Sequence, residues 1–302
     1  MLKKRLIIIL GVLLILSIPL MARAQDDDGI PVIVFYSVGT GYSDIYLLDL
    51  TTLTQYRLTD DIHSNSFPSL SPDGTQVAFQ SNRNGGWQIY VLDLATMDMT
   101  QLTENGNHYY PQWSPDGSQL AYTDASANVA QIAVRDMTTG DVRLVTDSNT
   151  NNYLPHWSAD GEEIVVTAGG DIITITQATG DMSAPLVVGD GWETDPDWSP
   201  DGRYVLYTTG AIGADDLYVV YMNTGEIFQI TDATMDEIDP TWSPDSKQIA
   251  FAGDENDDGA YDLFIMTRDG TNHQQLTDRY DNRAPSWGIL RVPLSNFDPV
   301  EE

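Results

Sequence analysis

The chain has 302 residues and a formal net charge of −31, with 45 Asp and Glu residues against 14 Lys and Arg residues. This acidity disfavours nucleic acids and anionic membrane surfaces as partners, because both require a basic footprint. The sequence contains no cysteine, which excludes disulfides and a cysteine-linked lipid anchor, so packing alone must stabilise the fold.

The first 24 residues have the pattern of a secretory signal peptide. Lys3, Lys4 and Arg5 precede an apolar run over residues 6–20, and the small-residue sequence "ARA" ends at Ala24. The run is shorter than the ~20 residues that span a bilayer. We expect cleavage after Ala24, an extracytoplasmic location, either secreted or periplasmic, and no stable membrane insertion. Cleavage leaves ten basic residues against 45 acidic ones, a net charge of −35, which favours solubility and cationic or basic partners.

A seven-residue motif recurs through the rest of the chain. The clearest copies are "PQWSPDG" and "PDWSPDG", and variants of both occur. The leading prolines are Pro68, Pro111, Pro155, Pro196, Pro240 and Pro285. Successive copies are 41 to 45 residues apart, and a period near 44 residues indicates a repeat architecture.

Each repeat contains short runs of strand composition separated by turn residues. In the Ser-Pro-Asp-Gly stretch, proline presets the first dihedral angle of a type I turn and glycine accepts the positive φ that often follows. A large indole two residues after the leading proline suits burial between packed sheets. We expect this for Trp113, Trp157, Trp198, Trp242 and Trp287. Four strands in about 44 residues match one blade of a β-propeller.

The two ends of the repeat region complement each other. Residues 30–60 supply three strand-like runs without a leading strand, and "APSWGILR" near the C-terminus is a leading strand without a following unit. Together they make one blade, which closes the ring and removes its open sheet edges. We therefore predict an all-β, six-bladed propeller of four-stranded antiparallel blades over residues 30–294. A short linker at 25–29 precedes it, an acidic tail at 295–302 follows it, and the protein is expected to be a monomer.

The repeats resemble the WD40-like repeat of TolB-type propellers and of the propeller domains of prolyl-oligopeptidase-like enzymes. "PSLSPDGTQVAFQSNRNGGWQIYVLDL" and "PTWSPDSKQIAFAGDENDDGAYDLFIM" follow that pattern most closely. The resemblance extends from residue 30 to about residue 292 and implies the fold, but propellers serve many unrelated functions. TolB has an additional N-terminal α/β domain, whereas only residues 25–29 lie between the expected cleavage site and the first strand. A Tol–Pal role is therefore not expected by analogy. The peptidases carry a G-x-S-x-G nucleophile motif, which this chain lacks.

The loops before each leading proline are rich in Asp, Glu, Asn and aromatic residues, and in a propeller they gather around the axis. We expect them to form a face that recognises a protein, peptide or glycan without catalysis. Turn-forming loops of the same composition are the alternative. The candidate ligand-binding residues are His63, Asn65, His108, Tyr109, Tyr110, Tyr153, Trp192, Glu193, Asp236, Glu237 and Arg283. His63 and His108 lie in neighbouring loops, where both could face a funnel around the axis. The alternative function is therefore a small metal-assisted hydrolase or lyase that uses this funnel. No catalytic residue is assigned.

The stretch "DENDDGAYD" matches the start of a calcium-binding loop. Asp254, Asn256, Asp258 and Asp262 would supply side-chain oxygens around Gly259. The twelfth position is Ile265, where a bidentate Glu is usual, and the loop joins strands rather than helices. The sequence therefore leaves two interpretations open, a weak calcium site and an acidic hairpin loop.

Overall fold

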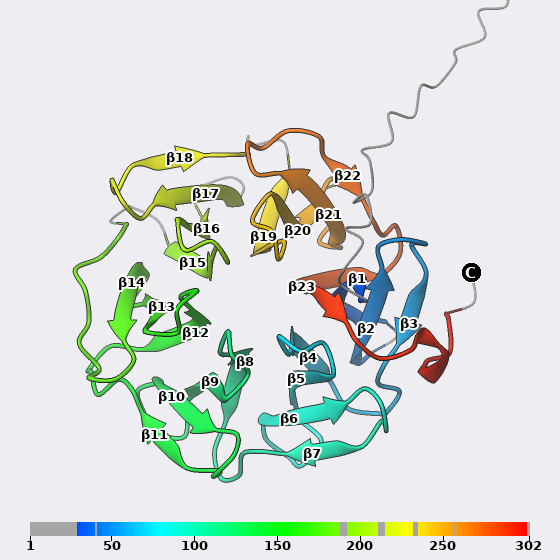
Figure 1. Ribbon diagram of the computed structural model, residues 1–302, viewed down its shortest axis with the longest axis horizontal. Helices are drawn as coiled ribbons and strands as arrows, with labels where there is room; N and C mark the ends of the chain where they lie inside the picture. The colour runs from blue at the N-terminus through cyan, green and yellow to red at the C-terminus, as the bar shows by residue number, and fades with distance from the viewer. Residues whose placement is uncertain are drawn as a thin grey trace, which may run out of the picture.

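The computed structural model describes residues 29–300, except residues 40, 188–191, 211–214, 232–234 and 257. It shows six antiparallel sheets arranged as a ring of blades around a central axis (Figure 1), which confirms the predicted six-bladed propeller. The predicted signal peptide lies outside the described residues. No helix within the described ranges is long and apolar enough to cross a membrane.

The strands are named below from the innermost to the outermost position in each blade. Blade 1 contains β23 (Asp281–Leu290), β1 (Ile30–Val38), β2 (Ser43–Asp49) and β3 (Gln55–Arg57). Blade 2 contains β4 (Asn65–Leu70), β5 (Gln76–Ser81), β6 (Gln88–Asp93) and β7 (Met99–Gln101). Blade 3 contains β8 (His108–Trp113), β9 (Gln119–Asp124), β10 (Gln131–Asp136) and β11 (Val142–Leu144).

The second half of the ring repeats this order. Blade 4 contains β12 (Asn152–Trp157), β13 (Glu163–Ala168) and β14 (Asp171–Thr176). Blade 5 contains β15 (Trp192–Trp198), β16 (Tyr204–Gly210), β17 (Asp215–Tyr221) and β18 (Ile227–Gln229). Blade 6 contains β19 (Asp236–Trp242), β20 (Gln248–Asp254), β21 (Asp262–Thr267) and β22 (Gln274–Gln275).

Blade 1 closes the ring as predicted. Strand β23, from the C-terminal end of the chain, pairs antiparallel with β1 from Ile30 opposite Leu290 to Val38 opposite Asp281. The N-terminal part of the chain supplies the three outer strands of this sheet, and Figure 1 shows the red and blue strands side by side. The sheets at the two ends of the repeat region are thereby joined by backbone pairing.

Blade 4 differs from the other blades at its outer edge. Two isolated bridges, Ile175 with Met182 and Ile172 with Val187, take the place of a fourth strand. Pro185 lies between these bridges and has no N–H to donate to a strand ladder. The outer segment of this blade therefore pairs only at intervals.

The Ser-Pro-Asp-Gly stretches form the tight turns after the inner strands. In the copy after β8, the Ser114 hydroxyl donates to Asp116 at 2.7 Å and accepts from the backbone N–H of Gln119 at 2.9 Å. Gly117 has a φ of 71°, as the turn prediction requires. In the last copy Ser246 takes the same left-handed conformation, with a φ of 58°.

The recurring tryptophans belong to the core between neighbouring blades. Four of them, Trp113, Trp157, Trp198 and Trp242, are 3 to 8% exposed, which confirms the burial predicted for them. The fifth, Trp287, is only partly buried and packs against the core between blades 6 and 1. Trp157 Nε1 also donates to the Gln112 carbonyl of the preceding blade at 3.1 Å. These side chains therefore connect blades by both packing and hydrogen bonding.

The chain continues to pack against blade 1 beyond residue 292. A short 3₁₀ helix, η1 (Leu294–Asn296), leads to Phe297, which is 6% exposed and contacts Tyr56 edge-on. The backbone N–H of Val300 donates to the Gln55 carbonyl at 2.8 Å. This segment, expected to be an acidic tail, lies beside β3 (Figure 1) and contributes a buried aromatic ring.

Candidate functional site

Every inner strand is interrupted by a bulge at the residue before its leading proline. In β8, for example, pairing with β9 shifts register between Tyr109 and Gln112, where Pro111 has no N–H to offer. The six residues at this position have φ between 48° and 55°, a conformation uncommon outside glycine. They form what we call the axial ring: Phe67, Tyr110, Leu154, Asp195, Asp239 and Ala284.

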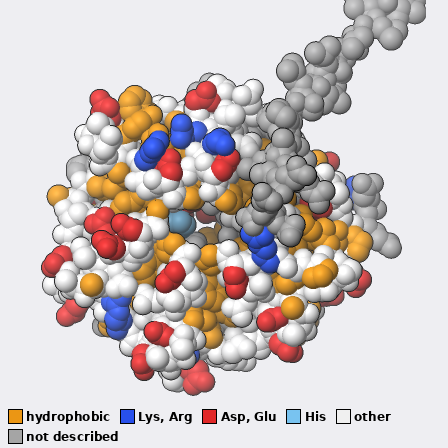
Figure 2. All heavy atoms as spheres, viewed as in Figure 1, with side chains coloured by type: hydrophobic (Ala, Val, Ile, Leu, Met, Phe, Trp, Pro, Cys, Tyr) orange, Lys and Arg blue, Asp and Glu red, His pale blue; other side chains and the backbone are white. Residues whose placement is uncertain are grey.

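The axial ring lines a central cavity of 510 Å³. The cavity wall continues along the inner strands to the turns that follow them, including Pro72, Pro115, Pro200 and Pro244. Figure 2 shows this hollow at the centre of the molecule, with hydrophobic side chains gathered around it. The cavity therefore extends toward the Ser-Pro-Asp-Gly turns, at the opposite end of the inner strands from the loops that the sequence favoured.

The two halves of the axial ring differ in chemistry. Blades 2, 3 and 4 contribute Phe67, Tyr110 and Leu154, and the first two rings meet edge to face at 4.6 Å between centroids. Blades 5 and 6 contribute Asp195 and Asp239. One wall of the cavity is therefore aromatic and aliphatic, and the facing wall carries carboxylates.

Side chains two residues beyond the axial ring join neighbouring blades. The Ser286 hydroxyl oxygen accepts from the backbone N–H of Leu70 at 3.0 Å, and Asp197 Oδ2 accepts from that of Trp242 at 2.9 Å. His156 Nδ1 accepts from the Trp198 N–H at 3.2 Å, which places the imidazole proton on Nε2, 3.1 Å from Asp197 Oδ1. This second belt of polar side chains stabilises the wall of the cavity.

The carboxylates of the axial ring hold their protons more tightly than free carboxylates. Burial, then the nearby negative charge of Asp239 and of Asp215, raises the pKa of Asp195 well above its usual value. Burial likewise raises the pKa of Asp239 to about 6, although the Ala284 N–H and the Arg283 cation favour its ionised form. Burial, then the negative charge of Asp195, raises the pKa of Tyr110 to about 12. The protein therefore only partly compensates the negative charge that these carboxyl groups acquire when they ionise.

Comparison with known protein families identifies the family of this propeller. The family model described as PD40, TolB beta propeller domain, matches residues 109–289, which is more than half of the chain. The chain belongs to the TolB beta propeller family.

Individual relatives of this TolB-type propeller match it over a limited length in sequence and over most of the chain in structure. The Tol-Pal system protein TolB of Francisella tularensis subsp. tularensis is 33% identical over 89 residues, which are 29% of this chain and 20% of that protein. The chain thus spans about a fifth of the length of this curated relative. The structure of TolB from Acinetobacter baumannii has a TM-score of 0.75 at 22% identity, over 85% of this chain and 66% of that one. An oligogalacturonate lyase in complex with manganese has a TM-score of 0.56 at 17% identity, over 82% and 73% of the two chains. At these identities the structures establish the fold alone.

Several predicted site residues of this TolB-type propeller are buried between blades. Asn65, His108, Glu193 and Glu237 are 0 to 5% exposed, and each precedes its leading proline by three residues. Glu237 Oε2 accepts from the Thr231 hydroxyl at 2.9 Å, and the Asn65 amide donates to the Thr59 hydroxyl at 3.3 Å. The Gln88 side chain links His108 to Thr103. In blades 2, 3 and 6 this position therefore anchors the inner strand to the outer edge of the preceding blade.

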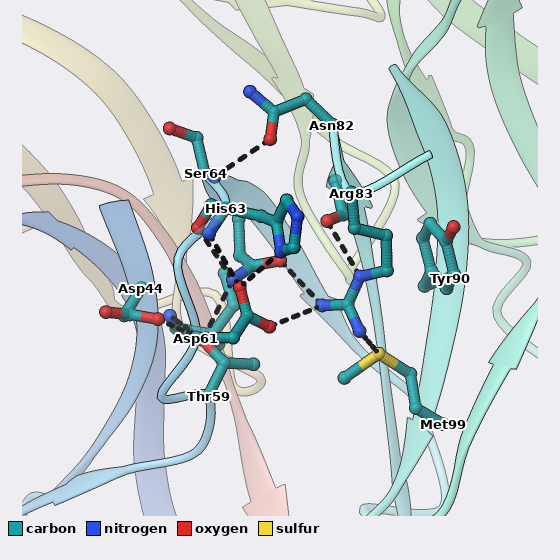
Figure 3. Close-up of polar contacts among 12 residues, drawn as sticks. Asp44, Thr59, Asp61, His63, Ser64, Asn82, Arg83, Tyr90 and Met99 are labelled. Atoms are coloured by element: carbon teal, nitrogen blue, oxygen red, sulfur yellow. Dashed lines mark hydrogen bonds and ion pairs between the residues drawn. The ribbon is translucent and has the colours of Figure 1, made fainter. Parts of the chain in front are cut away.

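The remaining loop residues lie outside the cavity wall. His63 pairs with Asp61, whose carboxylate also contacts Arg83 at 3.0 Å (Figure 3). Trp192 is 73% exposed. Tyr109 lies beside Trp87, and Tyr153 is half-buried.

Asp236 and Arg283 belong to one polar network near blade 6. Asp236 accepts from the backbone N–H of Asp215 at 2.6 Å and from the Tyr261 hydroxyl. Arg283 Nε donates to Asp281 at 2.7 Å, and its guanidinium lies 4.2 Å from the Tyr261 ring centroid. Tyr110 is thus the one predicted residue that lines the axial cavity described above.

The other axial-ring residues were not singled out from the sequence. Their signal was nevertheless present, because each directly precedes a leading proline in the repeat. Aligning the copies at that column gives Phe, Tyr, Leu, Asp, Asp and Ala in chain order. Residues at the same position of every inner strand surround the axis of a propeller. Once the bulge before each proline is known, this aligned position therefore predicts the residues of the axial ring.

The residues of the predicted calcium loop do not converge on one point. Asp254 is 6% exposed and its carboxylate accepts from the backbone N–H groups of Asn256, Asp258 and Gly259. Asp262 instead accepts from the side chains of Gln275 and Thr277 on the outer side of the blade. Within the described part of the chain no three acidic or histidine side chains are grouped to hold a metal ion. The contacts of this loop are those of an acidic hairpin.

Proposed function

We propose that this chain is an exported, non-catalytic binding propeller that takes a segment of a protein or peptide partner into its axial cavity. The observation that supports this is the 510 Å³ cavity with an aromatic and proline-rich wall facing two carboxylates. Its volume lies within the range of about 300–1,000 Å³ typical of ligand pockets. Such a cavity admits a few side chains of an extended peptide but not a folded domain. Its apolar wall favours a peptide over a glycan.

Binding is favoured over catalysis by the positions of the histidines. His63 Nδ1 lies 3.3 Å from Asp61, whereas the nearest carboxylate to His108 Nε2 is Asp124 at 3.6 Å. His108 is also 5% exposed, so its ring does not face a funnel. A hydrolase or lyase would need these groups directed at one substrate position, and their contacts direct them elsewhere.

Export is the part of the proposal that rests on residues 1–24. Their basic start, apolar run and small-residue end are the features that a signal peptidase recognises. Sequencing the N-terminus of the protein recovered from outside the cytoplasm tests it. We expect the chain to begin at Gln25, and an uncut Met1 terminus in that fraction would contradict cleavage.

A peptide library displayed on phage tests the binding function. The cavity is blocked with Leu154→Trp, which places an indole where Phe67 and Tyr110 show that a ring is tolerated. Leu144→Trp, on the outer strand β11 where Leu144 is 55% exposed, is the matched control. We expect peptides selected on the wild type to bind the Leu144→Trp variant equally well. They should no longer bind the Leu154→Trp variant. Failure to select any peptide, or equal binding to both variants, would contradict the proposed function.

A further inference from the structure

The axial ring presents opposite chemistry across the cavity. In a ring of six blades, blade 5 faces blade 2 and blade 6 faces blade 3, as Figure 1 shows. Asp195 therefore lies across the axis from Phe67, and Asp239 lies across it from Tyr110. A ligand in the cavity contacts carboxylates on one side and aromatic rings on the other.

The carboxyl groups of the acidic wall, once ionised, are only partly compensated by the cations around them. Arg291 lines the cavity from blade 1, just after β23. Arg283 is the cation near Asp239, but its Nε is bonded to Asp281 at 2.7 Å. Asp215 adds negative charge near Asp195. Carboxylates held in a poorly hydrated site are costly unless a cation pairs with them. The wall is therefore suited to a positively charged ligand group.

Asp197 gives an independent indication at the same wall. It lines the cavity two residues beyond Asp195, is 4% exposed, and its Oδ1 accepts no hydrogen bond. His156 Nε2 lies 3.1 Å from this oxygen without forming a hydrogen bond to it. A buried carboxylate oxygen without a hydrogen-bond donor is unusual in a folded protein.

We propose that the axial cavity recognises a primary ammonium or guanidinium group, carried by a Lys or Arg side chain of the bound peptide, between Asp195 and Asp239. This inference rests on the proposed peptide-binding function and specifies its ligand. Charge-assisted hydrogen bonds to two carboxylates bind such a group strongly. The aliphatic stem of Lys or Arg packs against apolar surface, which Phe67 and Tyr110 supply on the facing wall.

The test compares peptides selected from the phage library on the wild type, on Asp195→Asn/Asp239→Asn and on Asp98→Asn. Asp98 is an exposed residue of the turn before β7, so the last variant removes an acidic charge far from the cavity. Each wild-type peptide is also synthesised with its Arg replaced by citrulline or its Lys replaced by norleucine, which removes the charge and keeps the aliphatic stem. Agmatine, a free guanidine, serves as a competitor. Circular dichroism establishes that the variants are folded.

We expect one Lys or Arg to recur in the selected peptides. Its neutral replacement and the double Asn variant should each weaken binding at least about 30-fold, as expected for removing one partner of a buried charge pair. Asp98→Asn should bind as the wild type does. Agmatine should compete weakly, since it lacks the peptide's other contacts, whereas agmatine that binds as tightly as the peptide would contradict a peptide source. Peptides that are blocked by Leu154→Trp but show no basic preference and bind the double Asn variant equally would overturn this inference and leave the proposed function intact.

Discussion

The backbone N–H of Leu70 donates a hydrogen bond to the Ser286 hydroxyl across 3.0 Å, although 216 residues separate the two in the chain. The same kind of contact joins sequential blades, as between the Trp113 N–H and the Ser69 hydroxyl at 3.4 Å. Strand β23, the inner strand of blade 1, is therefore linked to blade 2 by the same kind of contact that links blade 2 to blade 3. Ring closure uses a side-chain contact in addition to the pairing of β23 with β1.

We predict that Ser286→Ala lowers the free energy of unfolding by about 1–3 kcal/mol, because it leaves the Leu70 N–H without its acceptor. Urea denaturation measures the change. Ser69→Ala, the internal copy, should cost a similar amount, and Ser126→Ala at an exposed loop position should stay within about 0.5 kcal/mol. An unchanged midpoint for Ser286→Ala would show that the contact does not contribute to closure.

Two tryptophans of the same strand differ in burial and therefore should differ in their contribution to stability. Trp198 is 6% exposed between blades 4 and 5, whereas Trp192, at the start of the same strand, is 73% exposed. Trp198→Ala should cost roughly 3–5 kcal/mol through lost packing and the cavity left behind. Trp192→Ala should change stability by less than about 0.5 kcal/mol. Thermal unfolding of both variants is the measurement, and equal losses would contradict the assignment.

The repeat made the fold predictable in detail, because turn chemistry, indole spacing and the complementary ends all indicate one closed propeller. The cavity was harder to predict. It depends on a backbone bulge before each proline, and a single turn motif does not reveal which way the preceding side chain points. The acidic and aromatic loop residues were conspicuous in sequence, but Asn65, His108 and Glu237 are used to join blades. Composition alone does not distinguish such structural hydrogen bonds from a binding surface.

The C-terminal segment should stabilise blade 1. Phe297 is buried against Tyr56, and Val300 in the same segment is 41% exposed. We predict that Phe297→Ala lowers the free energy of unfolding by about 3–5 kcal/mol. Val300→Ala, the control, should change it by less than about 0.5 kcal/mol. Denaturant titration followed by tryptophan fluorescence measures both, and a neutral Phe297→Ala would mean that the segment is not part of the stable fold.

The loop at residues 254–262 should behave as a hairpin organised by Asp254. Asp254→Ala removes the acceptor of three backbone N–H groups and should cost about 1–3 kcal/mol, whereas Asp258→Ala at an exposed position should cost little. Calorimetric melting in millimolar calcium and in chelator should give the same temperature for the wild type. A calcium-dependent rise that disappears in Asp258→Ala would instead establish the metal site suggested by the sequence.

Glu193 lacks the partner that its counterpart in the next blade has. In blade 4 the Leu186 N–H donates to the Ile172 carbonyl, and in blade 5 the Ile230 N–H donates in the same way to the Leu217 carbonyl. The next residue, Val187 in blade 4, therefore occupies the position that Thr231 has in blade 5. Thr231 donates its hydroxyl to Glu237, but valine has no hydroxyl. Glu193 is accordingly 2% exposed with its Oε2 lacking a hydrogen-bond partner, and burial, then the charge of Asp171, raises its pKa.

This arrangement predicts a dependence of stability on pH. A carboxyl whose pKa is raised by folding binds its proton more tightly in the folded state than in the unfolded state. The free energy of unfolding therefore falls as pH rises from the pKa of the unfolded state, near 4.5, through the higher pKa of the folded state. Glu193→Gln cannot ionise and should become more stable than the wild type as pH rises through that window, with little difference below it. Val187→Thr should reduce the same loss by supplying a donor to the carboxylate. Glu237→Gln is the comparison, because Glu237 already has its hydroxyl donor and should show no such gain. Urea denaturation of the four proteins between pH 4 and 8 measures these differences, and parallel curves for the wild type and Glu193→Gln would show that the missing threonine has no energetic consequence.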